Sequence, residues 1–281
     1  MTGAAPARDA IGAAPAHGAI DLVVNCFERT YRDVLAPGTF ARIEADNATR
    51  FGTRTALVNN VDDRADAQRR ADALIATGEI DRVAFVADHI EAALARTRVP
   101  RDELSWHLDW GLVAVTLDGA PWVLHWDADV RLREPCDWTG PAIELMERDP
   151  RVLAANPNWE IPNLDQFTSE DAGAFALGHG FSDQVFLGRR SELGGPIYGQ
   201  RCVARWRYPY PDSFEARIDA HLRHAGRLRA TYRDAIYEHP VTMGTSWPHR
   251  SLPVRLKAAR NHYGIRLLAR LPWRPRHLRQ L

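Results

Sequence analysis

The 281-residue sequence predicts an α/β protein whose mostly parallel sheet is flanked by helices. Three observations lead to this fold class. Short apolar runs alternate with amphipathic segments through the first half of the chain, which favours a parallel sheet covered on both faces. Hydrophobic residues make up 45% of the chain, enough for the core of one large domain. Polar clusters follow the apolar runs, as expected at the ends of strands.

Four apolar runs in the first half are predicted as strands. They are residues 19–27, 55–60, 82–87 and 121–126. Apolar residues at helical spacing predict helices over about residues 63–77 and 90–98, which Gly78 and Pro100 end. Residues 106–117 are predicted as a further helical or mixed segment.

The second half is less regular. A helix ends near Asp149, a strand follows at 152–156, and residues 157–180 are predicted as a long loop rich in Asn, Gly and Pro. The remaining predictions are a strand at 181–190, an amphipathic helix at 211–222 and a strand at 229–237 that leads into Glu238-His239-Pro240.

Two aspartates one residue apart, Asp127 and Asp129, end the strand predicted at 121–126. Side chains alternate along a strand, so both carboxylates face the same way if the extended conformation persists. Mg²⁺ and Mn²⁺ prefer hard oxygen ligands and take one or two carboxylates beside phosphates and waters. The pair therefore predicts a site for a divalent cation and a diphosphate, although a solvated strand end has the same sequence.

Polar clusters fall at the carboxyl end of each of the first four predicted strands. They are Glu28-Arg29-Thr30, Asn59 to Asp63, Asp88-His89 and the Asp127/Asp129 pair. Ligands of open α/β sheets bind outside these ends, so the four clusters are expected to form one site. The alternative is that they are ordinary polar loops.

Over roughly residues 20–245 the order of elements resembles the GT-A fold glycosyltransferases, particularly the inverting family 2 type. Residues 23–30 are similar to the first strand and donor-binding turn, and Asn59 to Asp63 is similar to the acidic turn that contacts the base. Asp127-Ala128-Asp129 resembles the family's metal motif. Phe214-Glu215 is similar to the acidic pair that carries the catalytic base, and Glu238-His239 lies where many GT-A enzymes place a metal-ligand histidine.

The resemblance implies a transferase that moves a sugar from a UDP- or GDP-linked donor to an acceptor hydroxyl with Mn²⁺ or Mg²⁺. The acceptor would be a glycan, a lipid-linked molecule or a small molecule. The implied donor contacts are Phe27, Glu28, Arg29, Asn59, Asp62, Asp63 and Asp127, and the implied metal ligands are Asp127, Asp129 and His239. Asp127 would lean toward the ribose, and Asp129 would bind the metal. Glu215 is the first candidate for the base, followed by Asp183 and Asp212.

Two residues depart from the family pattern. Asn59 stands where the family usually has Asp, and its carbonyl can still accept a hydrogen bond from a base N–H. Phe214 stands where the pattern has its first acid, which leaves Glu215 alone.

Several of these residues also have a structural interpretation. Asp212 and Glu215 have the spacing of a helix capping box. Asp62 and Asp63 suit the N-cap of the next helix, a role compatible with contact to a base. His239 before Pro240 is consistent with a simple strand end, and Asp183 with a plain strand entry.

Two other enzyme classes fit the same residues less well. Haloacid dehalogenase-like phosphatases place Asp-x-Asp after the first strand, but here three predicted strands precede it. Sugar-phosphate nucleotidyltransferases need a Gly-rich basic loop after strand one, where this chain has Cys26-Phe-Glu-Arg-Thr. A non-catalytic binding protein with a GT-A-like sheet remains as an alternative.

Charge is balanced overall and uneven along the chain. The formal net charge is zero, which does not suggest nucleic-acid binding, but residues 239–281 hold eight Arg, one Lys and no acid. Residues 246–281 are predicted as a basic amphipathic helical tail that lies on an anionic membrane or packs on the domain. Residues 1–18 are predicted as a flexible leader. Three scattered cysteines and the lack of a 20-residue apolar run indicate a cytoplasmic protein, peripheral to the inner membrane face if the tail binds there.

Overall fold

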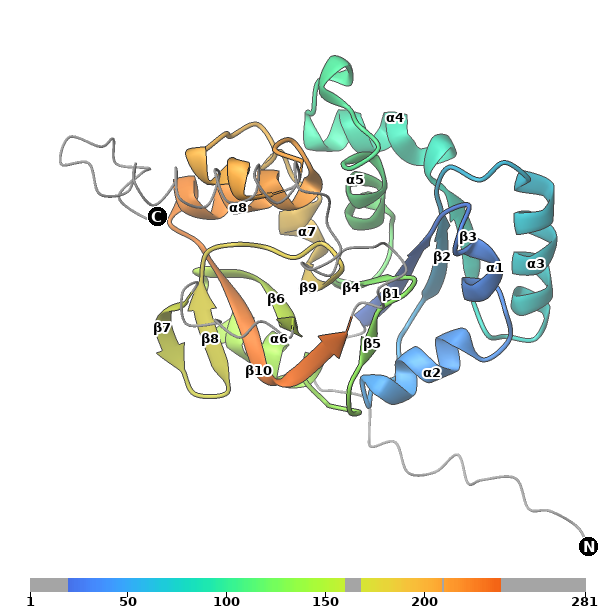
Figure 1. Cartoon of the computed structure of the whole chain (residues 1–281), viewed down its shortest axis with the longest axis horizontal. Helices are drawn as coiled ribbons and strands as arrows, with labels where there is room; N and C mark the ends of the chain where they lie inside the picture. Colours follow the sequence, from blue (N-terminus) through green and yellow to red (C-terminus); the bar gives the residue numbers. More distant parts are fainter. Residues whose placement is uncertain (1–19, 160–167, 209, 239–281) are drawn as a thin grey trace, which may run out of the picture.

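The computed structural model describes residues 20–159, 168–208 and 210–238 and builds them around one mixed sheet (Figure 1). The expectations for the leader, for His239 and for the basic tail concern residues outside these ranges. The strands are β1 (Ile20–Cys26), β2 (Arg54–Val58), β3 (Arg82–Phe85), β4 (Trp122–Asp127), β5 (Arg131–Leu132), β6 (Val152–Trp159), β7 (Thr168–Ala172), β8 (Phe175–Gly178), β9 (Val185–Arg189) and β10 (Leu228–Glu238). The helices are α1 (Tyr31–Val34), α2 (Thr39–Asp46), α3 (Arg64–Ala76), α4 (Val86–Thr97), α5 (Asp109–Thr116), α6 (Thr139–Arg148), α7 (Arg190–Leu193) and α8 (Phe214–Ala225).

The strand order is β3-β2-β1-β4-β9-β6-β10-β8-β7, with β5 paired to β10. The first four strands along the chain are parallel, so their carboxyl ends share one edge. β9 runs antiparallel between β4 and β6, and β10 is again parallel to β6. The predicted α/β class is therefore confirmed, with the antiparallel pairings gathered in the second half.

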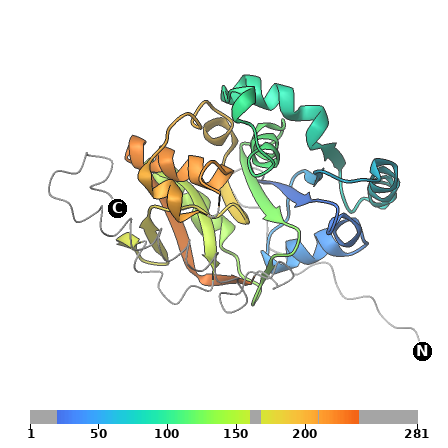
Figure 2. The same cartoon turned by 45° about the horizontal axis from the view of Figure 1, so that its top comes forward.

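Two apolar cores lie on the two faces of the sheet. Alternation along β1 sends Leu22 and Val24 to a core that α1, α2, α3 and α6 complete, whereas Val23 faces a second core. Helices α4, α5, α7 and α8 close that second core. Figures 1 and 2 show α4, α5 and α8 on the same side of the sheet. The face under α5 and α8 is the one that carries the site described below.

The long loop predicted over residues 157–180 is wrong in part. β6 continues to Trp159, and β7 and β8 form an antiparallel hairpin that turns at Gly173, whose φ of +68° suits glycine. β7 has the sequence TSEDA and is largely exposed at the end of the sheet. Its sequence lacks the apolar alternation that identifies a strand. Pairing with the buried strand β8, and not its own sequence pattern, holds β7 in the extended conformation.

The third predicted strand also ends earlier than expected. Val86 and Ala87 begin α4 directly after Phe85, because Val86 and Ile90 are one helical turn apart and both are buried. Asp88 and His89 accordingly lie in the first turn of a helix and not in a loop.

A buried ion pair fixes the opposite edge of the sheet. Asp21 and Arg190 are 1% and 4% exposed, and Arg190 Nη2 lies 3.0 Å from Asp21 Oδ2. Asp21 also accepts from the amides of Thr53 and Ala120, at 3.0 and 2.7 Å. Burial lowers the pKa of Arg190, and the nearby Asp21 opposes this.

Asp21→Asn is expected to lower the free energy of unfolding by about 3 kcal/mol, because it leaves a buried guanidinium without its counter-charge. Chemical denaturation measures this. Glu170→Gln is the matched control: Glu170 pairs with Arg151 at 3.0 Å but is exposed, so its loss should cost about 1 kcal/mol or less. Equal losses of unfolding free energy in the two variants would contradict the structural role given to the buried Asp21–Arg190 pair.

Within the described ranges, no helix combines the length and the apolar composition that a bilayer crossing requires.

Candidate active site

Three polar side chains share one face at the carboxyl edge of the parallel strands. Asn25 pairs in register with Asp127. Asn59 follows β2, and its backbone N–H donates to Cys26 O at 2.8 Å. Alternation places them on the face of the core under α5, because Val23, Leu57 and Val123 point to that core. The sheet therefore brings together residues that are 34 to 102 positions apart.

Asp127 is the last residue of β4 and is held by its neighbours. Asn25 Nδ2 donates to Asp127 Oδ1 at 3.3 Å, and the Ala128 amide donates to the same oxygen at 3.2 Å. The extended conformation stops here, since the Val130 amide closes a turn on Asp127 O at 3.2 Å. A turn, and not strand alternation, therefore positions Asp129 relative to Asp127.

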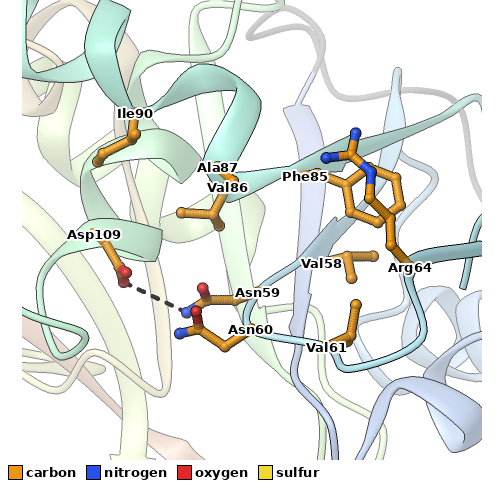
Figure 3. A pocket seen from close by; sticks show the side chains of 10 residues that line it. All are labelled: Val58, Asn59, Asn60, Val61, Arg64, Phe85, Val86, Ala87, Ile90 and Asp109. Carbon is orange, nitrogen blue, oxygen red and sulfur yellow. Dashed lines mark hydrogen bonds between the residues drawn. The ribbon is translucent and has the colours of Figure 1, made fainter.

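A pocket of about 280 Å³ opens beside these residues, between the ends of β2 and β3 and the helices α4 and α5 (Figure 3). It is lined by Val58, Asn59, Asn60, Val61, Arg64, Phe85, Val86, Ala87, Ile90 and Asp109. Asn59 Nδ2 points to Asp109 Oδ1 at 3.4 Å, the contact drawn in the figure. Burial raises the pKa of Asp109, and the hydrogen bonds from Trp110 and Asn59 act against that rise.

The wall of the pocket opposite Asp109 is formed by a stacked cation. The Arg64 guanidinium lies over the Phe85 ring, 4.0 Å from its centroid, and Arg64 Nη1 donates to Asp88 Oδ1 at 2.9 Å. The floor between the walls turns sharply at Asn60, whose φ is +46°.

The predicted donor residues Phe27, Glu28 and Arg29 form the turn after β1, and they lie outside the lining of this pocket. Glu28 Oε2 accepts from the Asp62 amide at 2.8 Å, which ties the β1 turn to the β2 turn. Asp63 caps α3, where its side chain accepts from the Asp66 amide at 2.8 Å. The N-cap interpretation is thus confirmed for Asp63.

Glu215 lies at the start of α8 and is partly buried, one helical turn before the fully buried Asp219. Burial raises its pKa well above the usual range, and the negative charges of Asp183 and Asp219 raise it further. The Asp183 and Asp219 carboxylates therefore lie close enough for their charges to act on Glu215.

The capping-box interpretation of Glu215 is wrong. Ser213 is the N-cap of α8 and accepts from the Ala216 amide, so Glu215 is one position too early to complete such a box. Asp212 is exposed and pairs with Arg201 at 3.0 Å and Arg205 at 3.2 Å. Helix capping does not account for a carboxyl group in the position of Glu215.

Asp183 lies in a segment fixed by buried side chains. Asn156 Nδ2 donates to Ser182 O at 2.9 Å and to Val185 O, and Ser182 Oγ lies 2.7 Å from Tyr237 Oη. Asp219 Oδ1 accepts from the Gly180 amide at 2.8 Å. The segment that carries Asp183 is thus anchored to β6, β10 and α8.

One backbone hydrogen bond joins the turn that carries Asp127 to the segment that carries Asp183. The Asp127 amide donates to Gln184 O at 2.7 Å, so the end of β4 lies next to the residue that follows Asp183. The Asp127 turn and the segment that carries Asp183 are therefore neighbours in space.

Aromatic packing sets the position of α8 in this region. Phe214 is fully buried. A Cβ added to Gly111 of α5 would lie only 2.5 Å from the Phe214 ring, so the glycine allows this close contact. Behind it, His125 is stacked between Trp110 and Phe186, at centroid distances of 4.7 and 4.9 Å. Phe214 thus replaces the expected acid with a core contact, and Glu215 keeps the acidic position.

His125 is fully buried, and neither ring nitrogen has a hydrogen-bond partner among the described residues. Burial lowers its pKa to about 3, so the imidazole stays neutral in the folded protein. An unfolded chain binds the proton near the usual value of 6.5, so stability is present above pH 6.5 and is lost as the pH falls toward 3.

His125→Phe is expected to raise the free energy of unfolding by about 1 kcal/mol at pH 7, because an unpaired buried N–H is removed from an aromatic stack. It should also flatten the loss of stability between pH 6.5 and pH 3, which denaturation at several pH values measures. His107, whose pKa burial lowers to about 4, will leave part of the slope. If His125→Phe is less stable than the wild type and its stability depends on pH as strongly, His125 is not the buried neutral group responsible for this pH dependence.

Some residues of the region were not identified from the sequence. Asp109 and Arg64 line the pocket from helices, and Gln184 links the two halves, but none belongs to an Asp-x-Asp pattern or to a strand-end cluster. Of the tryptophans near this region, Trp126 is in the core, whereas Trp106 is 63% exposed. Among the described residues, no three His, Cys, Asp or Glu side chains gather as a metal cage, and His239 lies outside them.

The mixed, mostly parallel sheet flanked by helices is that of the GT-A fold. Among solved structures, the chain is similar to the mannosyltransferase PcManGT from Pyrobaculum calidifontis in complex with GDP-Man and Mn²⁺. That TM-score is 0.50 at 13% identity, over 94% of this chain and 68% of that one. The likeness is one of fold.

Other solved structures are similar at lower scores. Glucosyl-3-phosphoglycerate synthase from Mycobacterium tuberculosis, in complex with Mn²⁺, UDP and phosphoglyceric acid, has a TM-score of 0.45 and 15% identity over 90% of this chain and 78% of that one. GalNAc-T7 with UDP, GalNAc and Mn²⁺ has a TM-score of 0.45 and 9% identity over 79% of this chain and 44% of that one. No protein-family model matches the sequence, and no curated protein matches it significantly.

Proposed function

We propose that this protein is a metal-dependent glycosyltransferase that moves a sugar from a nucleotide-diphosphate donor to an acceptor hydroxyl with inversion. The observation that carries the proposal is the hydrogen bond from the Asp127 amide to Gln184 O at 2.7 Å. It connects an edge suited to a nucleotide with a carboxylate pair suited to proton removal.

The pocket supports binding of the nucleoside part of the donor. Its polar lining residues Asn59 and Asp109 offer an amide and a carboxylate, and its apolar residues offer flat walls. Asp62, Asp63 and the turn of Phe27, Glu28 and Arg29 surround this edge. On the basis of the family pattern, we assign Asp62 and Asp63 to the base and the turn of Phe27, Glu28 and Arg29 to the rest of the donor.

The Asp127 turn fits a hard divalent cation. Asp127 and Asp129 supply oxygen ligands, and the buried Asn25 Oδ1 beside them has no hydrogen-bond partner among the described residues. Within the part of the chain that the structure describes, no three His, Cys, Asp or Glu side chains form an all-protein cage. Mg²⁺ is commonly held by one or two carboxylates, and phosphates and waters complete its coordination. Asp127, Asp129 and, in the family pattern, His239 would hold Mn²⁺ or Mg²⁺. The cation would neutralise charge on the departing diphosphate.

Glu215 is assigned as the base that takes the proton from the attacking hydroxyl. Its raised pKa makes its carboxylate a stronger base than an exposed Glu, and the proton moves from the acceptor oxygen to a Glu215 oxygen during attack. Asp183 keeps that pKa high through its charge and is the second candidate for the same role. One base acting on the face opposite the leaving group gives inversion.

We also propose a role in acceptor binding for the basic C-terminal tail. Residues 246–281 would contact anionic membrane through their arginines, which suits a lipid-linked acceptor, and this rests on sequence alone.

A thermal-shift screen tests the donor. With Mn²⁺ or Mg²⁺ present, one class of nucleotide sugar should raise the Tm of the wild type, and a ligand at about 100 times its Kd adds about 2.7 kcal/mol. Asp127→Ala should lose the shift, whereas Asp72→Ala, an exposed acid on α3, should retain it. If no nucleotide sugar stabilises the wild type at high concentration, the proposed function fails.

A further inference from the structure

We infer that the donor nucleotide carries guanine, whose Watson–Crick edge is read by Asp109 and Asn59. The inference rests on the proposed function, because it names the base that the donor pocket takes. It adds Asp109, on α5, to the residues that determine specificity.

The pocket has the size and the walls for a single base. Its volume of about 280 Å³ is at the lower limit for ligand pockets, so it holds part of a donor and not the whole molecule. Val61, Val86, Ile90 and Phe85 provide apolar lining against which a flat ring can pack. The polar groups of the lining therefore decide which ring edge fits.

Asp109 is the one carboxylate in the lining, and its charge is not matched by the pocket's arginine. The Arg64 guanidinium is held by Asp88 and lies over Phe85 on the other wall. Oδ1 accepts from the Trp110 amide at 2.6 Å and from Asn59 Nδ2 at 3.4 Å, and the backbone amide of Asp109 itself also donates to this carboxylate. The bonds from Trp110 and Asn59 do not use Oδ2.

Asn59 supplies a donor beside this carboxylate. Its 3.4 Å contact to Asp109 is longer than the usual 2.7–3.2 Å range, so the amide N–H is weakly engaged. The pocket therefore presents the two oxygens of a carboxylate, of which Oδ1 already accepts from the Trp110 amide, and an adjacent donor on an amide.

Guanine is the common base with the complementary edge. Its N1–H and N2 amino group donate side by side, and its O6 accepts, which matches one carboxylate and one amide N–H. Uracil has a single N–H between two carbonyl oxygens, so one of those oxygens would face the carboxylate. Adenine and cytosine each place a lone-pair nitrogen beside a single amino group. Because an unpaired or repelled polar group is costly in a partly buried site, these bases should bind more weakly.

Binding of nucleoside diphosphates in Mn²⁺, measured by calorimetry, tests the inference. For the wild type, GDP should bind at least about tenfold more tightly than UDP, ADP or IDP, since inosine lacks only the N2 amino group. Asp109→Asn should weaken GDP binding and improve binding of XDP, because xanthine carries a carbonyl where guanine has the N2 amino group. A change in folding would not improve XDP binding. Asp72→Asn, at an exposed acid of α3 outside the pocket lining, is the matched control and should keep the preference for GDP.

The outcomes separate the two proposals. Metal-dependent binding of UDP or ADP in preference to GDP would overturn the guanine assignment and leave the donor function standing. A preference for GDP that Asp109→Asn leaves unchanged would also overturn the role of Asp109. Binding of no nucleoside diphosphate would remove the proposed function itself.

Discussion

Asp127→Asn and Asp129→Asn are each expected to lower the rate of sugar transfer by about 10²- to 10³-fold, while the fold remains intact. The leaving diphosphate gains charge as the bond to the sugar breaks, and the turn after β4 is where carboxylates can hold the cation that stabilises it. Each substitution removes one anionic ligand and keeps the size of the side chain. Release of nucleoside diphosphate, followed during a titration of Mn²⁺, measures the effect.

The metal dependence distinguishes a ligand from a structural residue. A lost ligand should raise the Mn²⁺ concentration needed for half-maximal rate, whereas Asp72→Asn on α3 should leave it unchanged. Wild-type rates for both variants at every Mn²⁺ concentration would show that the pair does not bind the metal.

Glu215→Gln is expected to lower kcat by about 10²- to 10⁴-fold and to leave binding of the donor nucleotide unchanged, because the amide cannot take the acceptor proton. The wild-type rate should rise with pH through a pKa well above 4.5, since only the carboxylate acts as a base. Asp183→Asn should shift this rise to lower pH, because it removes a negative charge that raises the pKa of Glu215. Rates at saturating donor between pH 5 and pH 9 measure both effects.

Stability provides an independent readout for the same residue. The folded pKa of Glu215 is higher than the unfolded one, so the charged carboxylate destabilises the folded state as the pH rises through this interval. Glu215→Gln should therefore be at least as stable as the wild type at neutral pH. A variant that is both active and less stable would show that Glu215 is a structural residue.

Strong local signals made the parallel half of the fold predictable. β1, β2 and β4 are apolar runs with polar ends, and α3 has both its Asp63 cap and its Gly78 stop. β7 could not be predicted, because an exposed strand at the end of a sheet takes its order from its partner and its own sequence is polar.

The candidate site was predictable only where it follows strand ends. Asn59 and Asp127 were found because a strand precedes each of them. Asp109 was missed because it opens a helix whose place beside β2 depends on packing between residues far apart in the sequence. For Glu215, the sequence left a choice between capping and catalysis, and Ser213 at the N-cap excludes the capping box.

The most direct test of a metal-nucleotide site at this edge is a crystal structure with Mn²⁺ and a nucleoside diphosphate, in which anomalous scattering locates the metal. We expect Mn²⁺ about 2.0–2.3 Å from a carboxylate oxygen of Asp127 or Asp129, the diphosphate on the metal and the base in the pocket beside Asn59 and Asp109. A metal or a base bound elsewhere on the protein would contradict the account.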